Sequence, residues 1–199
     1  WREDRLASNG SIASDHYNEA WAKEFSSLGL EDGSVKVQIS DLQSRFNVNN
    51  LRAEDSSDAE ASLKLIFSAL DLSDAAYTEV RESVLLQAWS DAKTLKTVNL
   101  LQPAQRRELE PLLAALPATN VAVNINTASE ALLSALVGQR SSALVRKIVS
   151  ERKHTPIMDL NHPSFSIYAS NSTKLVVSSE YFDVQTTASY GQNSSYLST

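Results

Sequence analysis

One stretch of the chain, Val35–Leu51, restricts the possible folds most, because its hydrophobic pattern changes halfway along. From Val35 to Ile39 apolar residues alternate with polar ones, which is the pattern of a β-strand with one buried face. Beyond Asp41 the alternation stops and asparagines become frequent. Asparagine side chains bond to nearby backbone groups and tolerate left-handed conformations, so this second half predicts an ordered turn that leaves a sheet.

Several side chains of this turn are predicted to have structural roles. Phe46 is expected to anchor the turn in an apolar core, and Arg45 is placed to pair with Asp41. Asn47 and Asn49 are expected to bond to the backbone of the turn and to fix its shape.

Ahead of the strand, apolar residues recur at the spacing of one helical face. They are Tyr17, Trp21, Phe25 and Leu28. This spacing predicts a helix, Ser14–Leu28, with Ser14 as its N-cap and with Glu19 and Lys23 flanking its apolar face.

After Leu51 the spacing of apolar residues is helical as far as about residue 153. Serines near positions 56 and 73 are placed to cap two helices, and Pro103 suits the first turn of a third helix that is predicted to end at Leu116. Thr127, with Glu130 three residues later, forms a capping box at the start of a predicted helical hairpin.

The period of two returns near the end of the chain. Two strands are predicted there, Lys174–Ser178 and Tyr181–Tyr190, and the polar tail from Gly191 is expected to be mobile. Helices inserted within a sheet make an α+β arrangement. We expect one discontinuous domain from residues 1–51 and 165–199, and an inserted all-helical domain from residues 52–164.

Composition excludes several classes of protein. The chain has 199 residues, of which 42% are hydrophobic and 21% charged, which is typical of globular proteins. Its net charge of −6 disfavours nucleic acid and anionic membrane surfaces as partners. There is no cysteine, so disulfides and thiolate metal sites are excluded. No apolar run reaches the roughly 20 residues of a membrane helix, and the first residue is Trp1, so an N-terminal segment is expected to have been removed.

Catalytic signals are weak. The three histidines lie far apart in sequence and in no metal-ligand spacing, and neither a nucleophile motif nor a glycine-rich phosphate loop is present. The chain is therefore not expected to be an enzyme.

Four segments together resemble a known family. They are Asn18-Glu19-Ala20-Trp21-Ala22, the stretch from Ile39 to Leu51 with its Arg45-Phe46-Asn47-Val48-Asn49-Asn50-Leu51 motif, Val123-Asn124-Ile125-Asn126-Thr127-Ala128-Ser129, and Tyr181-Phe182-Asp183-Val184. In these segments the chain is similar to the periplasmic part of general secretion pathway protein K, a minor pseudopilin of the bacterial type II secretion system. The Arg-Phe-Asn-x-Asn-x-Leu motif is the most specific of these features.

The resemblance implies a pilin-like helix packed on an antiparallel sheet, with a large all-helical domain inserted. It also implies a binding role at the tip of the pseudopilus, where the partners are the I-type and J-type minor pseudopilins, other pseudopilins of the fibre and, as a further candidate, secreted cargo. Family members lie in the periplasm and are anchored in the inner membrane by an N-terminal helix. The helix predicted ahead of the strand is the candidate partner contact, through Tyr17, Glu19, Trp21, Lys23 and Phe25. The candidate structural motif consists of Asp41, Arg45, Phe46, Asn47, Asn49, Asn124, Asn126 and Thr127.

The chain departs from the family at its calcium segment. Family members carry an Asp-Trp pair followed by an acidic stretch and a Gly-Ala-Glu segment, whereas this chain has Ala88-Trp89-Ser90-Asp91 and no Gly-Ala-Glu. Calcium needs six to eight oxygen ligands, several of them carboxylates. We therefore expect no calcium and no other cofactor.

A second interpretation concerns residues 126–159. Two helices joined by a short turn, the second of them basic, resemble the helix-hairpin-helix module that binds nucleic acid. The turn has one glycine, Gly138, where that module has two. Two packed helices with a solvated basic edge, formed by Arg146, Lys147, Arg152 and Lys153, are the favoured interpretation, and no nucleic acid is expected as a partner.

Overall fold

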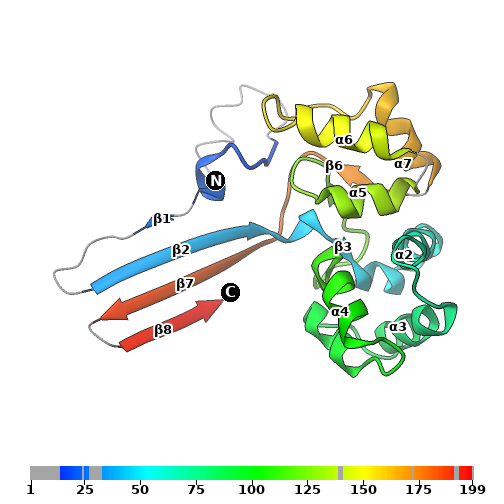
Figure 1. The fold of residues 1–199 in the computed structure, drawn as a ribbon, viewed down its shortest axis with the longest axis horizontal. Coiled ribbons are helices and arrows are strands. Elements are labelled where there is room, and N and C mark those ends of the chain that lie inside the picture. The colour runs from blue at the N-terminus through cyan, green and yellow to red at the C-terminus, as the bar shows by residue number, and fades with distance from the viewer. Residues whose placement is uncertain are drawn as a thin grey trace.

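The computed structural model describes residues 14–23, 25–26, 33–138, 141–171, 173–190 and 193–198. A four-stranded sheet has the order β1-β2-β7-β8, and each neighbouring pair is antiparallel. Its strands are β1 (Phe25–Ser26), β2 (Gly33–Asp41), β7 (Phe182–Tyr190) and β8 (Asn193–Ser198). The sheet projects from the helices, which gather at one end of its strands (Figure 1).

The alternation between Val35 and Ile39 gives the predicted strand, and this strand pairs with the last part of the chain. Val35 lies opposite Ala188 and Ile39 opposite Val184 in the β2–β7 register. The prediction that the helices interrupt a sheet built from both ends of the sequence is therefore confirmed, as is the α+β class.

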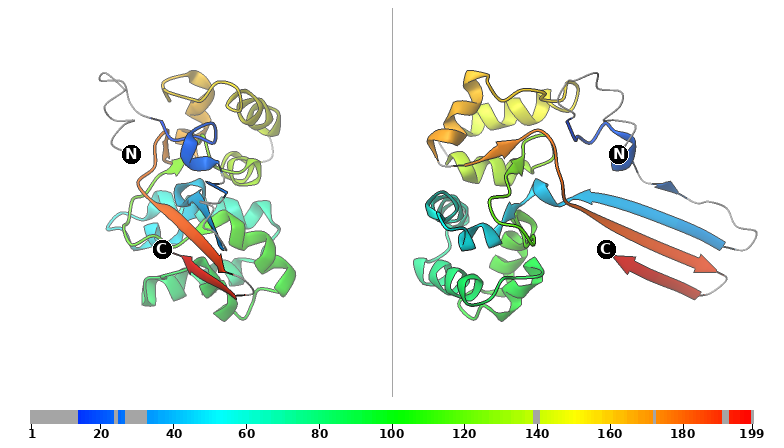
Figure 2. Two further views of the ribbon diagram at one scale, coloured as in Figure 1. Left: turned by 90° about the vertical axis from the view of Figure 1, so that its left-hand side faces the viewer. Right: turned by 180° about the vertical axis from the view of Figure 1, so that it is seen from behind.

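Residues 42–181, which we call the helical block, connect β2 to β7. Its helices are α2 (Ser57–Ala69), α3 (Asp74–Leu86), α4 (Pro103–Leu109), α5 (Glu130–Val137), α6 (Ser142–Glu151) and α7 (Ser166–Ser170). Two short parallel pairs complete it, β3 (Phe46–Asn47) with β4 (Leu113–Ala114) and β5 (Val123–Asn124) with β6 (Leu175–Val176). The block is broader than the sheet when the molecule is viewed along the strands (Figure 2).

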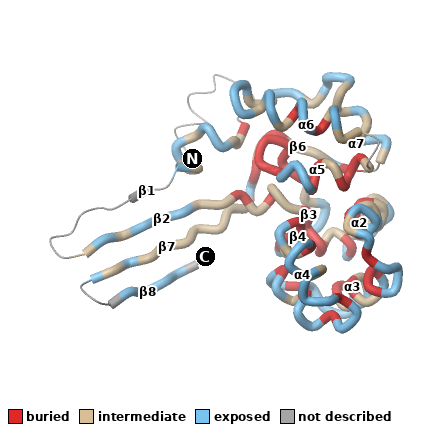
Figure 3. The backbone as a smooth tube through the Cα atoms, in the orientation of Figure 1, coloured by how far each residue is buried: buried red, intermediate tan, exposed pale blue. Residues whose placement is uncertain are grey.

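The hydrophobic core lies in the helical block. Apolar residues at helical spacing on α2 and α5 are fully buried, among them Leu63, Ile66, Leu132, Leu133 and Leu136. Figure 3 shows this concentration of buried residues, in contrast to the half-buried and exposed sheet. Tyr168 and Val177 also belong to this core, and the predicted domain boundaries at residues 51 and 165 stay a prediction.

The helix predicted from Ser14 to Leu28 is wrong within the described residues. A single 3₁₀ turn, η1 (Ala20–Ala22), and the short strand β1 take its place, and Leu28 lies outside the described residues. Tertiary hydrogen bonds hold this segment instead, because Asp15 N–H donates to the Val177 carbonyl and Tyr17 Oη donates to the Thr127 carbonyl, both at 2.9 Å.

Two helix ends and the tail also differ from prediction. α4 ends at Leu109 and not at Leu116, because Pro111 has no N–H for a helical hydrogen bond and the chain turns into β4. Ser129, and not Thr127, caps α5, since its Oγ accepts a hydrogen bond from Leu132 N–H. The tail predicted to be mobile forms β8 over residues 193–198, where it pairs with β7.

Candidate partner-binding surface

Asp41, the last residue of β2, lies where the sheet meets the helical block, and it is only 2% exposed. Its Oδ2 accepts hydrogen bonds from Thr127 Oγ1 at 2.5 Å and from Ser179 Oγ at 2.7 Å. Asn124 Nδ2 donates to the same oxygen at 3.1 Å, and Gln43 N–H donates to Oδ1 at 2.8 Å. Burial raises the pKa of Asp41, and these four hydrogen bonds oppose the rise. One carboxylate therefore joins the end of the sheet to three segments of the helical block.

The ion pair predicted between Asp41 and Arg45 is absent among the described residues. The Asp41 carboxylate accepts hydrogen bonds from hydroxyl and amide groups instead. Thr127 and Asn124 were predicted as motif residues, whereas Gln43 and Ser179 were not. Gln43 could have been found from its position two residues after an Asp that caps a turn, but one serine among many carries no such signal.

Several asparagine side chains pair with the backbone N–H and C=O groups of a residue far away in sequence, as a neighbouring β-strand would. We call this arrangement an amide clamp. Asn50 Nδ2 donates to the Val121 carbonyl at 2.8 Å, and Val121 N–H donates to Asn50 Oδ1 at 3.0 Å. Asn126 holds Ile157 in the same way, at 2.9 and 2.8 Å. Each clamp satisfies one N–H and one C=O of a half-buried residue, where water has little access to them.

Asn49 forms the most buried of these clamps. Its Nδ2 donates to the carbonyls of Trp89 and Leu116, both at 2.8 Å, and its Oδ1 accepts from Trp89 N–H at 3.0 Å. Asn47 lies beside it, with Oδ1 accepting from Leu116 N–H at 2.9 Å and Nδ2 donating to the Ala118 carbonyl at 2.8 Å. Both asparagines thus bind segments far away in sequence, in addition to their predicted role in fixing a turn.

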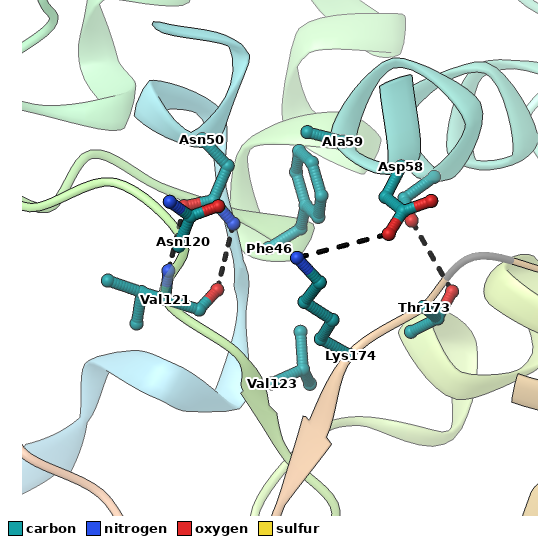
Figure 4. A pocket seen from close by; sticks show the side chains of 10 residues that line it. Phe46, Asn50, Asp58, Ala59, Asn120, Val121, Val123, Thr173 and Lys174 are labelled. Carbon is teal, nitrogen blue, oxygen red and sulfur yellow. Dashed lines mark hydrogen bonds and ion pairs between the residues drawn. The ribbon is translucent and has the colours of Figure 1, made fainter. Parts of the chain in front are cut away.

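Phe46 is 4% exposed and packs in the core, as predicted for an anchor. Its ring borders a cavity of about 30 Å³ between α2 and β5 (Figure 4). Lys174 Nζ lies 3.9 Å from Asp58 Oδ2 at the rim of this cavity. A space of this size has room for water and not for a larger ligand.

The segment 14–23 packs across the junction. Asp15 Oδ2 accepts a hydrogen bond from Ser179 N–H at 2.7 Å, and Tyr17 Oη donates to the Thr127 carbonyl at 2.9 Å. The Trp21 ring stands edge-on to Phe182, with centroids 5.1 Å apart. This segment therefore holds both the helical block and the first residue of β7.

The five residues predicted to contact a partner do not lie on one helical face. Tyr17 is 55% exposed and Lys23 is exposed, whereas Glu19 is half-buried and accepts a hydrogen bond at Oε2 from Trp21 Nε1 at 2.7 Å. Phe25 belongs to β1, opposite Val37. Tyr17 and Lys23 are therefore exposed, whereas Glu19 and Trp21 bond to each other within the segment.

The sheet has one apolar and one polar face. Side chains alternate between the two faces along each strand. The apolar face is defined by Val35, Val37, Ile39, Val184 and Leu197. Trp21 meets Phe182 on this side of the sheet. Its residues on β2 and β7 are half-buried, and Leu197 is 64% exposed. Beside the junction this face borders a hollow of about 400 Å³, lined by Tyr17, Ile39 and Arg45 among others.

The helical hairpin of α5 and α6 offers less free positive charge than its sequence indicates. The guanidinium of Arg152 donates to the carbonyls of Ile125 and Ala128, so this arginine closes the turn before α5. Gly138 has a φ of 72°, which explains the glycine at the end of α5. Nothing in this geometry favours nucleic-acid binding.

A hollow of about 620 Å³ lies between α6 and the loop that follows it. Asp159 and His162 are among the residues that line it, but each caps the loop, because Asp159 Oδ1 accepts from Asn161 N–H and His162 Nδ1 accepts from Ser164 N–H. Neither of these hydrogen bonds joins Asp159 to His162. Within the described ranges, no group of three or more His, Asp or Glu residues is placed to hold a metal ion, and no helix is long and apolar enough to span a bilayer.

Comparisons with known proteins agree with this architecture. Residues 123–178 match the family described as Type II secretion system (T2SS), protein K. This range contains α5, α6, the residues Asn124 and Thr127 that donate to Asp41, and the Asn126 clamp. No curated protein matches the chain in sequence.

A solved structure has the same fold over almost the whole chain. It is a chain of the crystal structure of the GspK-GspI-GspJ complex from the enterotoxigenic Escherichia coli type 2 secretion system. The TM-score is 0.73 at 20% sequence identity, and the alignment covers 98% of this chain and 84% of that chain. The resemblance to protein K that the sequence indicates is therefore confirmed by a family match and by a common fold.

Proposed function

We propose that this chain is a K-type minor pseudopilin, which acts by binding the I-type and J-type minor pseudopilins at the tip of the type II secretion pseudopilus. One observation carries this proposal. Residues 123–178, which match the protein K family, belong to a helical block that lies at one end of an antiparallel sheet with an open apolar face.

The open apolar face supports the pilin-like part of the proposal. Val35, Val37 and Ile39 point to one side of β2 and are only half-buried by the described residues. In the family that this chain resembles, an N-terminal helix lies against the sheet and also anchors the subunit in the inner membrane. Such a helix would cover the apolar face and place the described residues in the periplasm.

The helical block supports a position at the end of the fibre. It lies beyond the ends of β2 and β7 and is broader than the sheet (Figures 1 and 2). A second subunit stacked on that end would overlap with the block, so steric exclusion favours the terminal position. Binding, and not chemistry, is the activity that this arrangement supports.

The test is assembly with the purified soluble domains of the I-type and J-type subunits. Light scattering after size exclusion should give the mass of a 1:1:1 complex at tens of micromolar. Three separate monomers under these conditions would contradict the proposal.

A pair of charge reversals tests the predicted contact within segment 14–23. Lys23→Glu changes an exposed residue beside Trp21 and should weaken the complex. Lys93→Glu is the matched control, since Lys93 is an exposed lysine in the helical block, and its ion pair with Asp91 is long, with 3.8 Å between Nζ and Oδ2. Equal affinity of both variants would remove this segment from the interface.

A further inference from the structure

β8 forms an outer edge of the four-stranded sheet. On its inner side it pairs with β7 over six residues, from Asn193 opposite Tyr190 to Ser198 opposite Gln185. In an antiparallel strand every second residue turns its N–H and C=O groups toward the other side. Because no described segment pairs with that side, β8 presents a row of backbone donors and acceptors to a neighbour.

As far as the structure describes the chain, this edge lacks the features that keep edge strands apart from other chains. Natural edge strands are commonly protected by lysine, by proline or by a covering segment. Residues 184–198 contain neither a charged residue nor a proline, in a chain of which 21% is charged. Two large side chains of β8, Tyr196 and Leu197, are each 64% exposed.

The apolar face of the sheet continues to this edge. Leu197 lies opposite Thr186, and Thr186 lies opposite Val37, so the three form one row across β8, β7 and β2. The polar face ends differently, in a row of Tyr196, Thr187 and Lys36. A strand added beyond β8 would bring one of its own side chains next to Leu197, and an apolar side chain suits that position.

We propose that β8 is a strand-addition site, which pairs with an uncharged edge strand of a neighbouring pseudopilin that carries an apolar residue beside Leu197. Backbone hydrogen bonds give such an interface its affinity, and the alternate side chains give its specificity. The sheet projects away from the helical block, so the block does not obstruct this edge (Figure 1). This inference rests on the proposed function and assigns one of its contacts.

Leu197→Lys tests the proposal, because it adds a charge at the edge while the residue is exposed enough to leave the fold intact. Leu86→Lys is the matched control, since Leu86 is 89% exposed at the end of α3, in the helical block. Titration of each variant into the I-type and J-type subunits should show an affinity at least about tenfold lower for Leu197→Lys and no change for Leu86→Lys.

Hydrogen exchange gives a second measurement that does not depend on a variant. Amides of β8 should become protected when the wild-type chain joins the complex, because the added strand accepts their hydrogen bonds. A complex that forms with unchanged β8 exchange and equal affinities of both variants would overturn strand addition and leave the proposed function standing.

Two other outcomes would also overturn the inference. If the wild-type chain does not bind the I-type and J-type subunits at all, the proposed function fails together with it. If the chain alone forms dimers that Leu197→Lys dissociates, the occupant of the edge is a second copy and not a different pseudopilin.

Discussion

The helical block and the sheet differ in how much of their structure they stabilise by themselves. In α2 and α5 the core residues Leu63, Ile66 and Leu132 are fully buried by neighbouring helices. In the sheet, Asp41 is the single buried residue among those whose burial is described, and it is polar. The block thus has a complete core of its own, whereas the sheet has a regular ladder of backbone pairs and an apolar face that is still open.

This difference shows that buried apolar contacts are distributed unequally along the chain. A complete core stabilises the block without a partner, because burial of apolar area is the main favourable term in folding. An open apolar face and a free edge are costs for an isolated molecule and become favourable only on assembly. We therefore expect substitutions in the block to change folding, and substitutions on the sheet to change assembly.

The largest effect should follow from removing the anchor of the block. Phe46→Ala should lower the free energy of unfolding by about 3–5 kcal/mol, the range found for a buried phenylalanine. Val37→Ala, on the half-buried face of β2, should cost only about 1 kcal/mol, since less apolar area is lost. Urea denaturation of both variants measures the difference, and equal costs would show that the sheet is as well packed as the block.

The next effect should come from an amide clamp. Asn49→Ala leaves Trp89 N–H and two carbonyls without their buried partner, and an unsatisfied buried group costs about 1–3 kcal/mol. Asn18→Ala is the control, because Asn18 is exposed and its side chain donates one hydrogen bond, to the Lys153 carbonyl at 3.1 Å. Thermal unfolding should separate the two variants, and a stability loss confined to Asn18→Ala would contradict the role of the clamp.

The sequence predicts elements well where one short-range pattern decides them. The alternation around Val37 gives β2, helical spacing gives α2 and α3, and Ser73 caps α3 as expected, because its Oγ accepts from Ala76 N–H. The burial of Phe46 follows from its place at the change of pattern. Each of these depends on residues within one or two turns of each other.

The sequence predicts the structure less well where contacts between residues far apart in the chain determine it. Tyr17 and Trp21 have helical spacing, but the segment is held by Thr127 and Phe182, which are more than a hundred residues away. Asn49 could be recognised as a turn residue, whereas its partner Trp89 lies 40 residues further along the chain and has no local signature. The contacts that the I-type and J-type subunits make stay predictions for the same reason.

The junction between the two regions should respond to pH through Asp41. Burial raises the pKa of this carboxyl above its ordinary value of 3.8, so the folded protein binds the proton more tightly than the unfolded chain does. Its contribution to the free energy of unfolding therefore rises as pH falls from the raised pKa toward 3.8, and it is lost again as pH rises.

Asp41→Asn removes this titration and makes the effect measurable. The free energy of unfolding of the wild type, minus that of the variant, should increase as pH falls through this window. Asp71→Asn removes an exposed carboxylate and serves as the control. A difference that stays constant with pH would show that the junction does not keep Asp41 buried.

The smallest effect compares two aromatic pairs of similar geometry, one in each region. Trp21 and Phe182 meet edge-on at 5.1 Å beside the sheet, and Phe67 and Tyr77 meet edge-on at 5.8 Å within the block. Such pairs contribute about 0.5–1.5 kcal/mol beyond the area that they bury. Double-mutant cycles with leucine at each position isolate that coupling energy. We expect both couplings to fall within the range, because segment 14–23 is also fixed by the hydrogen bonds of Asp15 and Tyr17. A coupling near zero for Trp21 and Phe182 alone would mean that this segment is fixed only when the apolar face of the sheet is covered.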